Sequence, residues 1–125
     1  MSAPEYGAPR DWHTVESLRG TDEHGEPVWA QAADIAESLL ADLVDVARDN
    51  VLAYAPALPE DYPLGKCPAA YRLAHLMQTR NLWNAVTEDD GGGGFAGDEY
   101  AIRPVPLDWI IKQILRPKTA TPVAL

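Results

Sequence analysis

The sequence has a single cysteine, Cys67, among 125 residues, so no internal disulfide is possible. No CxxC pair or Cys/His cluster accompanies it, which argues against structural zinc. No apolar run approaches the roughly 20 residues of a membrane-spanning helix, and the first ten residues lack the apolar core of a signal peptide. We therefore expect synthesis in a reducing intracellular compartment, no membrane and no metal.

Basic residues are few: 10 lysines and arginines stand against 19 aspartates and glutamates, a formal net charge of −9 at pH 7. This charge excludes a nucleic-acid binder that works by neutralising phosphates. After Asp108 come Lys112, Arg116 and Lys118 with no further acid. An acidic group surrounds the glycine run at residues 91–94, and it comprises Glu88, Asp89, Asp90, Asp98 and Glu99. The two groups predict two different partners.

Motifs of catalysis and metal binding are absent from the sequence. His13, His24 and His75 form no HExxH motif and no i, i+4 pair, so we interpret them as solvated or packing residues. No GxSxG sequence marks a serine nucleophile. The GGGG run ends a predicted helix and lacks a following GK[ST], whereas a phosphate-binding loop begins a helix. The sequence therefore predicts no enzyme and no catalytic, cofactor-binding or metal-ligating residues.

Apolar residues recur with helical period over residues 34–54. Asp34 and Glu37 have the spacing of an acidic capping box, and Pro56 forbids continuation much beyond Tyr54. The apolar arc covers roughly half the circumference, wider than the ~100° stripe that faces one partner, so we expect two packing neighbours. This arc comprises Ile35, Ala36, Leu39, Leu40, Leu43, Val46, Ala47, Val51 and Tyr54.

A second helix is predicted over residues 68–86, with Pro68 in its first turn. Its wheel has two apolar stripes on nearly opposite sides, which in so small a protein indicates packing against another chain. Arg80 falls within the broader stripe, so its charge must reach the surface or pair with an acid of the first helix. The broader stripe is Ala69, Ala70, Leu73, Leu76, Met77 and Trp83; the second is Tyr71, Leu82 and Val86.

The remaining segments are predicted as an acidic, glycine-rich loop at residues 88–99, a third helix at 107–115 and an extended tail at 118–125. Trp83 and Trp109 are interpreted as core residues. The third helix is expected to face inward through Leu107, Ile110, Ile111 and Ile114.

Residues 1–33 are rich in proline, glycine and charge, which is typical of an irregular arm. Trp12 and Trp29 are costly to leave in water, so we expect a neighbouring subunit to cover them. The predicted fold is all-α: a small helical bundle at residues 34–117, a long irregular N-terminal arm, a Gly-rich loop and an extended C-terminal tail.

Three segments occur in order: AYAPALP at residues 53–59, LAHLMQTRNLWNAV at 73–86 and YAIRPVPLDWIIKQILRP at 100–117. Together they resemble head-to-tail adaptor (connector) proteins of long-tailed double-stranded-DNA bacteriophages, particularly those of high-GC actinobacterial hosts. The resemblance covers about residues 33–117, and the N-terminal arm lies outside it.

This resemblance implies an all-α protein, without catalytic residues, that forms a ring, most often a dodecamer. The ring would lie in the virion neck, between the portal protein and the stopper, tail-completion or tail terminator proteins, after assembly in the host bacterial cytoplasm. Double-stranded DNA would pass through it without sequence-specific binding, and a like-charged wall avoids trapping DNA. We therefore expect the lumen to be lined by Glu88, Asp89, Asp90, Asp98 and Glu99.

Two further surfaces are predicted. The basic tail is suited to docking on the portal by strand addition and charge contacts, through Arg116, Lys118, Pro122, Val123 and Leu125. Subunit contacts are expected at Tyr71, Leu82, Val86, Trp12 and Trp29. The alternatives are another neck protein (a stopper or tail-completion protein, whose folds are mostly β) and an acidic helical interaction or regulatory module.

Overall fold

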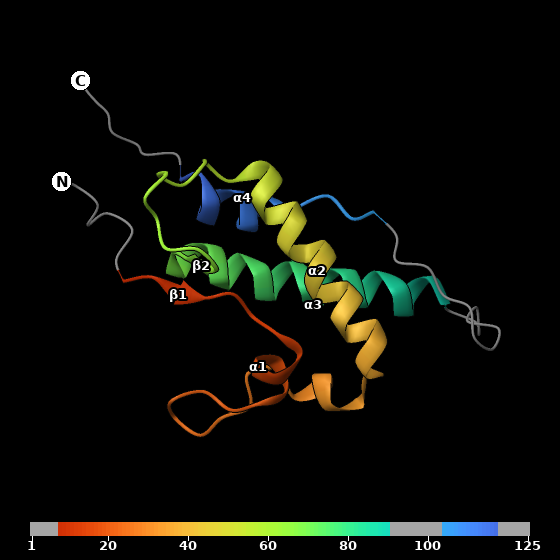
Figure 1. Cartoon of the computed structure of the whole chain (residues 1–125). Coiled ribbons are helices and arrows are strands. Elements are labelled where there is room, and N and C mark those ends of the chain that lie inside the picture. Colours follow the sequence, from red (N-terminus) through yellow and green to blue (C-terminus); the bar gives the residue numbers. More distant parts are fainter. Residues whose placement is uncertain (1–7, 91–103, 118–125) are drawn as a thin grey trace.

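The computed structural model describes residues 8–90 and 104–117, and this part of the chain is mostly helical. It also contains two short strands that the all-α expectation missed. No helix of the described residues is long and apolar enough to cross a membrane. The elements in chain order (Figure 1) are β1 (Arg10–Asp11), α1 (Val15–Arg19), the 3-10 helix η2 (Ala30–Asp34), α2 (Glu37–Tyr54), β2 (Lys66–Cys67), α3 (Ala69–Asp90) and α4 (Trp109–Leu115).

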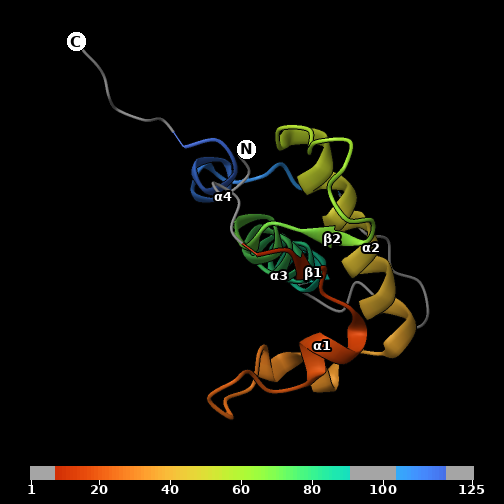
Figure 2. The same cartoon turned by 60° about the vertical axis from the view of Figure 1, so that its left-hand side comes forward.

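Helices α2 and α3 cross at the centre of the molecule, and α4 lies beside the first half of α3 (Figures 1 and 2). Two clusters of buried side chains hold this arrangement. The first joins α2 to α1 through residues that include Leu18, Leu40 and Leu43. The second brings Ile111 of α4 together with Cys67 of β2 and residues of α2 and α3. Burying each large apolar side chain contributes about 1.5–3 kcal/mol, so these clusters fix the crossing.

Residues 8–34 contain β1, α1 and η2, whose buried side chains pack on the longer helices, and this corrects the prediction of an irregular arm. β1 pairs antiparallel with β2, and Lys66 bonds the Asp11 carboxylate across the pair. Trp12 and Trp29 are 9% and 7% exposed and belong to the two buried clusters. The chain itself shelters both indole rings, so they need no neighbouring subunit to cover them.

Helix α2 begins at Glu37, three residues later than predicted. Asp34 ends η2, and the N-cap residue Ala36 makes no side-chain cap, so the predicted capping box does not form. The predicted end at Tyr54 is confirmed. The inward face is largely as predicted, although Val44 is also buried and Ala36 is exposed.

Helix α3 buries the narrower of its two predicted stripes. Tyr71, Leu82 and Val86 are at most 3% exposed, whereas Leu73 of the broader stripe is 48% exposed. Arg80 is exposed, so its charge reaches the surface. The narrower stripe is therefore ordinary core of the single chain.

Polar residues complete the buried side of α3: His75, Gln78 and Thr79 have no exposed area. His75 and Gln78 reach other elements through hydrogen bonds to Val44 of α2 and to Asn50 and Val105. Thr79 donates its hydroxyl to the His75 carbonyl. Because hydrogen bonding offsets the cost of burying polar groups, this side does not have to be uniformly apolar.

Helix α4 starts at Trp109, where the carboxylate of the N-cap residue Asp108 accepts the Ile111 amide at 2.9 Å. Ile111 and Leu115, four residues apart, form its inner side. Trp109 and Ile110 are 69% and 49% exposed. The predicted inward position of Ile110 and the core role of Trp109 are therefore wrong.

The sequence predicts that the acidic loop begins at residue 88, but Glu88, Asp89 and Asp90 are the last residues of α3. Further residues with predicted roles lie outside the described part of the chain: Asp98, Glu99, Lys118, Pro122, Val123 and Leu125.

Candidate functional site

The segment that links β1 to α1 carries polar side chains that meet α3. Thr14 Oγ1 accepts a hydrogen bond from the Ser17 amide at 3.1 Å, and Ser17 Oγ accepts one from the Thr14 amide at 2.8 Å. This reciprocal capping box satisfies amides at the start of α1. It places His13 immediately before the helix, where the residue is only 6% exposed.

His75 joins three parts of the chain. Its Nδ1 lies 3.3 Å from the backbone amide nitrogen of His13, and its Nε2 lies 2.9 Å from the Val44 carbonyl oxygen. Because the amide donates and the carbonyl accepts, the ring carries its proton on Nε2 and is neutral. This imidazole of α3 thereby ties the N-terminal segment and α2 together.

His13 is neutral by the same reasoning. Arg72 Nη1 lies 3.1 Å from His13 Nε2, and a guanidinium only donates, so Nε2 accepts. The proton is then on Nδ1, which donates to Ser17 Oγ at 2.9 Å. Since Ser17 Oγ itself donates to the Thr14 carbonyl, His13 is oriented as a donor to this serine and not as its general base.

Burial shifts the pKa values of this group. The pKa of His13 falls to about 4, chiefly because the ring is buried and secondarily because Arg72 is nearby. Burial also lowers the pKa of His75, against the opposing effect of its bond to Val44. The pKa of Arg72 is lowered by burial and then by the charge of Arg10. We refer to Arg10, His13, Arg72 and His75 as the histidine–arginine cluster.

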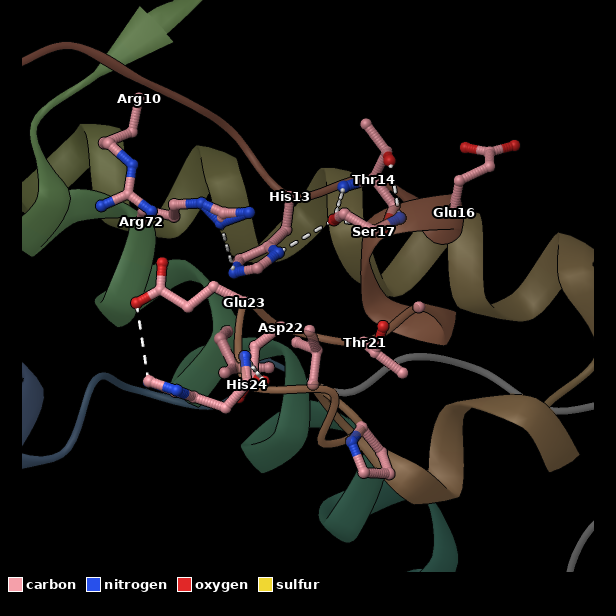
Figure 3. A pocket seen from close by; sticks show the side chains of 14 residues that line it. Arg10, His13, Thr14, Glu16, Ser17, Thr21, Asp22, Glu23, His24 and Arg72 are labelled. Carbon is pink, nitrogen blue, oxygen red and sulfur yellow. Dashed lines mark hydrogen bonds and ion pairs between the residues drawn. The ribbon is translucent and has the colours of Figure 1, made fainter.

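An open cavity of about 820 Å³ lies beside this cluster, within the range of about 300–1,000 Å³ for small-molecule sites. Figure 3 shows the Arg10 and Arg72 side chains close together, with His13 next to Arg72. Asp22 and Glu23 contribute carboxylates from the turn that follows α1. The cavity therefore has both cationic and acidic lining residues, and its cationic part adjoins the two neutral imidazoles.

Arg116 lies in a separate place, where α4 meets the end of α2. Its Nε donates to the Tyr54 carbonyl at 2.7 Å. Its guanidinium and the Lys112 ammonium lie 5.3 and 5.7 Å from the centroid of the Tyr54 ring. Arg116, expected to dock on the portal, thus already joins two helices.

Comparison with known proteins gives no relative for this geometry. No family model, curated protein or solved structure matches the chain. Within residues 8–90 and 104–117, no group of three or more His, Cys, Asp or Glu side chains is placed to hold a metal ion. The chemical character of the site therefore comes from its own atoms: two guanidiniums beside an open cavity, with two neutral imidazoles behind them.

The residues predicted to form subunit contacts all lie within the described part of the chain. The five residues expected at subunit contacts are all buried within the chain, and we correct that expectation: Trp12, Trp29, Tyr71, Leu82 and Val86. The interpretation assigned one stripe of α3, and the two tryptophans of the N-terminal segment, to a neighbouring chain, whereas segments of the same chain cover them.

The histidine–arginine cluster was missed because its two pairs, Arg10 with His13 and Arg72 with His75, come from segments that are far apart in sequence. One local signal was available: His75 and Gln78 follow Tyr71 at intervals of four and three residues, so they share a helix face with Leu82. This spacing predicts a buried polar residue that requires a partner. It does not identify that partner, since His13 is 62 residues away.

Proposed function

We propose that the chain is a structural, non-catalytic virion protein: a head-to-tail adaptor that forms a ring between the portal and the stopper, tail-completion or tail terminator proteins. The mostly helical fold and the three sequence segments at 53–59, 73–86 and 100–117 support this proposal. The dodecameric state and the location in the virion neck are parts of the same proposal.

The observation that carries the proposal is a set of exposed apolar side chains on two packed helices. Leu73 of α3 is 48% exposed, and Trp109 and Ile110 of α4 are 69% and 49% exposed. Large exposed aromatic residues are enriched at protein interfaces and often dominate their binding energy. We therefore assign subunit contact to these exposed side chains of α3 and α4 (Leu73, Trp109 and Ile110), referred to below as the α3–α4 surface, in place of the buried residues.

Assembly tests this assignment. The purified chain, mixed with the portal protein encoded in the same genome, is expected to form rings visible by electron microscopy and detectable by sedimentation. Trp109→Ser should reduce ring formation, while Leu64→Ser, which removes a side chain that is 97% exposed in a loop, should not. Normal rings in both Trp109→Ser and Ile110→Ser would reject the α3–α4 surface, and no wild-type rings on the portal would reject the adaptor function.

Portal attachment by the tail is tested separately. Deletion of residues 119–125 is expected to abolish attachment to the portal while leaving the helical circular-dichroism signal intact. Unchanged attachment would assign docking to another surface. The proposal also keeps the acidic residues around the glycine run on the channel wall, and a ring map with those residues on its outer rim would refute that part.

An acidic helical interaction module is the second candidate function. It is favoured by the net charge of −9 and by exposed acidic residues along α2, namely Glu37, Asp42, Asp45 and Asp49. Such a module would cover a basic surface of another protein. A protein that stays monomeric or dimeric beside the portal and shows no portal affinity would favour this alternative.

A further inference from the structure

Arg10 and Arg72 concentrate positive charge at the large cavity. Figure 3 shows their side chains together, and the nearby charge of Arg10 contributes to the lowered pKa of Arg72. Arg72 also lies in the first turn of α3, where the helix macrodipole disfavours a cation. Among the described residues, neither guanidinium forms an ion pair with a carboxylate.

Three carboxylates near the arginines, those of Asp11, Asp22 and Glu23, make contacts of their own, and Glu16 of α1 also lines the cavity. Asp11 bonds Lys66 across the strand pair. Asp22 Oδ1 accepts hydrogen bonds from the backbone amides of His24 and Glu26, at 2.8 and 3.0 Å, and thereby stabilises the turn that contains it. Glu23 lies 3.6 Å from the His24 ring nitrogen. Because no carboxylate of the described residues pairs with either guanidinium, the positive charge of the two arginines is available to a ligand in the cavity.

We propose that Arg10 and Arg72 bind a phosphate group in this cavity, carried by a small phosphate monoester. Two guanidiniums match the charge of a phosphate dianion and present paired N–H donors to its oxygens. The hydrogen bond from Arg72 to His13 orients one guanidinium before any ligand arrives, which lowers the entropic cost of binding.

The shape of the cavity favours an ester over the free ion. At about 820 Å³ it is much larger than one phosphate group, and Val28 and Leu76 contribute apolar lining beyond the arginines. A small organic group attached to the phosphate would lie against these side chains. This site is independent of ring formation, because every residue in it comes from one chain.

Isothermal titration calorimetry of the full chain at pH 8 and constant ionic strength tests the site with inorganic phosphate and with phenyl phosphate. Saturable binding of one equivalent is expected, and Arg10→Gln should weaken it about tenfold, the effect of losing one charge-assisted hydrogen bond. Arg10 is exposed and β1 pairs through its backbone, so this variant should keep the fold. Arg80→Gln, an exposed arginine of α3 outside the cavity lining, is the matched control and should bind normally.

The outcomes separate the sources of the phosphate. Tighter binding of phenyl phosphate identifies a monoester site, whereas equal binding of the two probes identifies a site for free phosphate. The proposal is overturned if neither probe binds saturably, if Arg10→Gln binds like the wild type, or if Arg80→Gln weakens binding as much as Arg10→Gln. Arg72→Gln, accepted only with an unchanged circular-dichroism spectrum, should weaken binding at least as much.

Discussion

Acidification from pH 7.5 to 5 is expected to destabilise the fold through its two buried histidines. In the native chain His75 Nδ1 accepts a hydrogen bond from the His13 amide, and His13 Nε2 accepts one from Arg72. Protonation of either nitrogen would bring two donors face to face. Arg10 and Arg72 oppose a charge on His13, and Arg48 and Arg72 oppose one on His75, while Asp45 favours it.

The pH window follows from where the unfolded chain takes up protons. An unfolded histidine protonates near pH 6.5, whereas folded His13 does so only near its pKa of about 4. Since the unfolded state binds more protons between these values, the stabilisation is fully present above pH 6.5 and is lost as the pH falls toward 4. The lowered pKa of His75 acts in the same direction.

The shifted pKa of His13 sets the size of the loss in unfolding free energy. With 1.36 kcal/mol per pKa unit, the shift from 6.5 to about 4 gives a loss of roughly 2 kcal/mol between pH 7.5 and 5, before any contribution from His75. This is a substantial part of the 5–15 kcal/mol typical of a domain. The carboxylate of Asp11 does not interfere, because Lys66 lowers its pKa and its contribution is lost only at more acidic pH.

Urea unfolding at both pH values, followed by circular dichroism, measures this loss. His13→Gln keeps an acceptor for Arg72 but cannot titrate, so it should remove about 2 kcal/mol of the pH dependence. His24→Gln is the control, because the His24 side chain is 76% exposed. Wild-type stability that is equal at pH 7.5 and 5, or a native His13 that titrates near 6.5 by NMR, would refute the reasoning.

Three further predictions test the core, the buried thiol and a helix cap. Leu82→Ala should lower the free energy of unfolding by about 2–5 kcal/mol in urea because Leu82 has no exposed area, while Leu73→Ala should change it by less than about 0.5 kcal/mol; equal effects would contradict the assigned buried side of α3. Burial raises the pKa of Cys67 to about 11, so Ellman's reagent at pH 8 should label it only after unfolding, and rapid labelling of the native chain would count against this burial. Asp108→Ala should cost about 1 kcal/mol of unfolding free energy by removing the α4 cap, with a smaller loss in Asp108→Asn, which keeps an acceptor oxygen.

Much of the helical layout could be predicted from local signals. The end of α2 at Tyr54 was predictable because Pro56 blocks continuation, and the start of α3 because Pro68 suits a first turn. The start of α2 was misplaced because Ile35 continues the apolar pattern into a stretch that turns as a 3-10 helix. Periodicity identifies the side that is buried, but it does not separate a helix from the turn that leads into it.

The buried side of α3 was misjudged for a non-local reason. The two apolar stripes predicted burial on both sides of this helix, yet Leu73 is 48% exposed and the buried side contains His75 and Gln78. Their burial depends on Val44, Asn50 and other acceptors supplied by distant segments. Such partners appear only when the chain is folded, so the histidine–arginine cluster was not predictable from local sequence.

The burial of the narrower stripe of α3 within one chain bears directly on self-association. Two apolar stripes on α3 do not require a second chain, because Tyr71, Leu82 and Val86 are covered by the chain itself. In the described part of the chain, the large apolar side chains that stay exposed lie elsewhere: Trp109 and Ile110 on α4, Leu73 on α3, Leu52 on α2 and Leu64 in a turn. Aromatic residues at the centre of an interface contribute far more than their share of its area, so even a small surface is sufficient to direct association once other contacts surround it. The proposed ring would therefore depend on contacts added around Trp109, and not on the release of side chains already buried in the monomer.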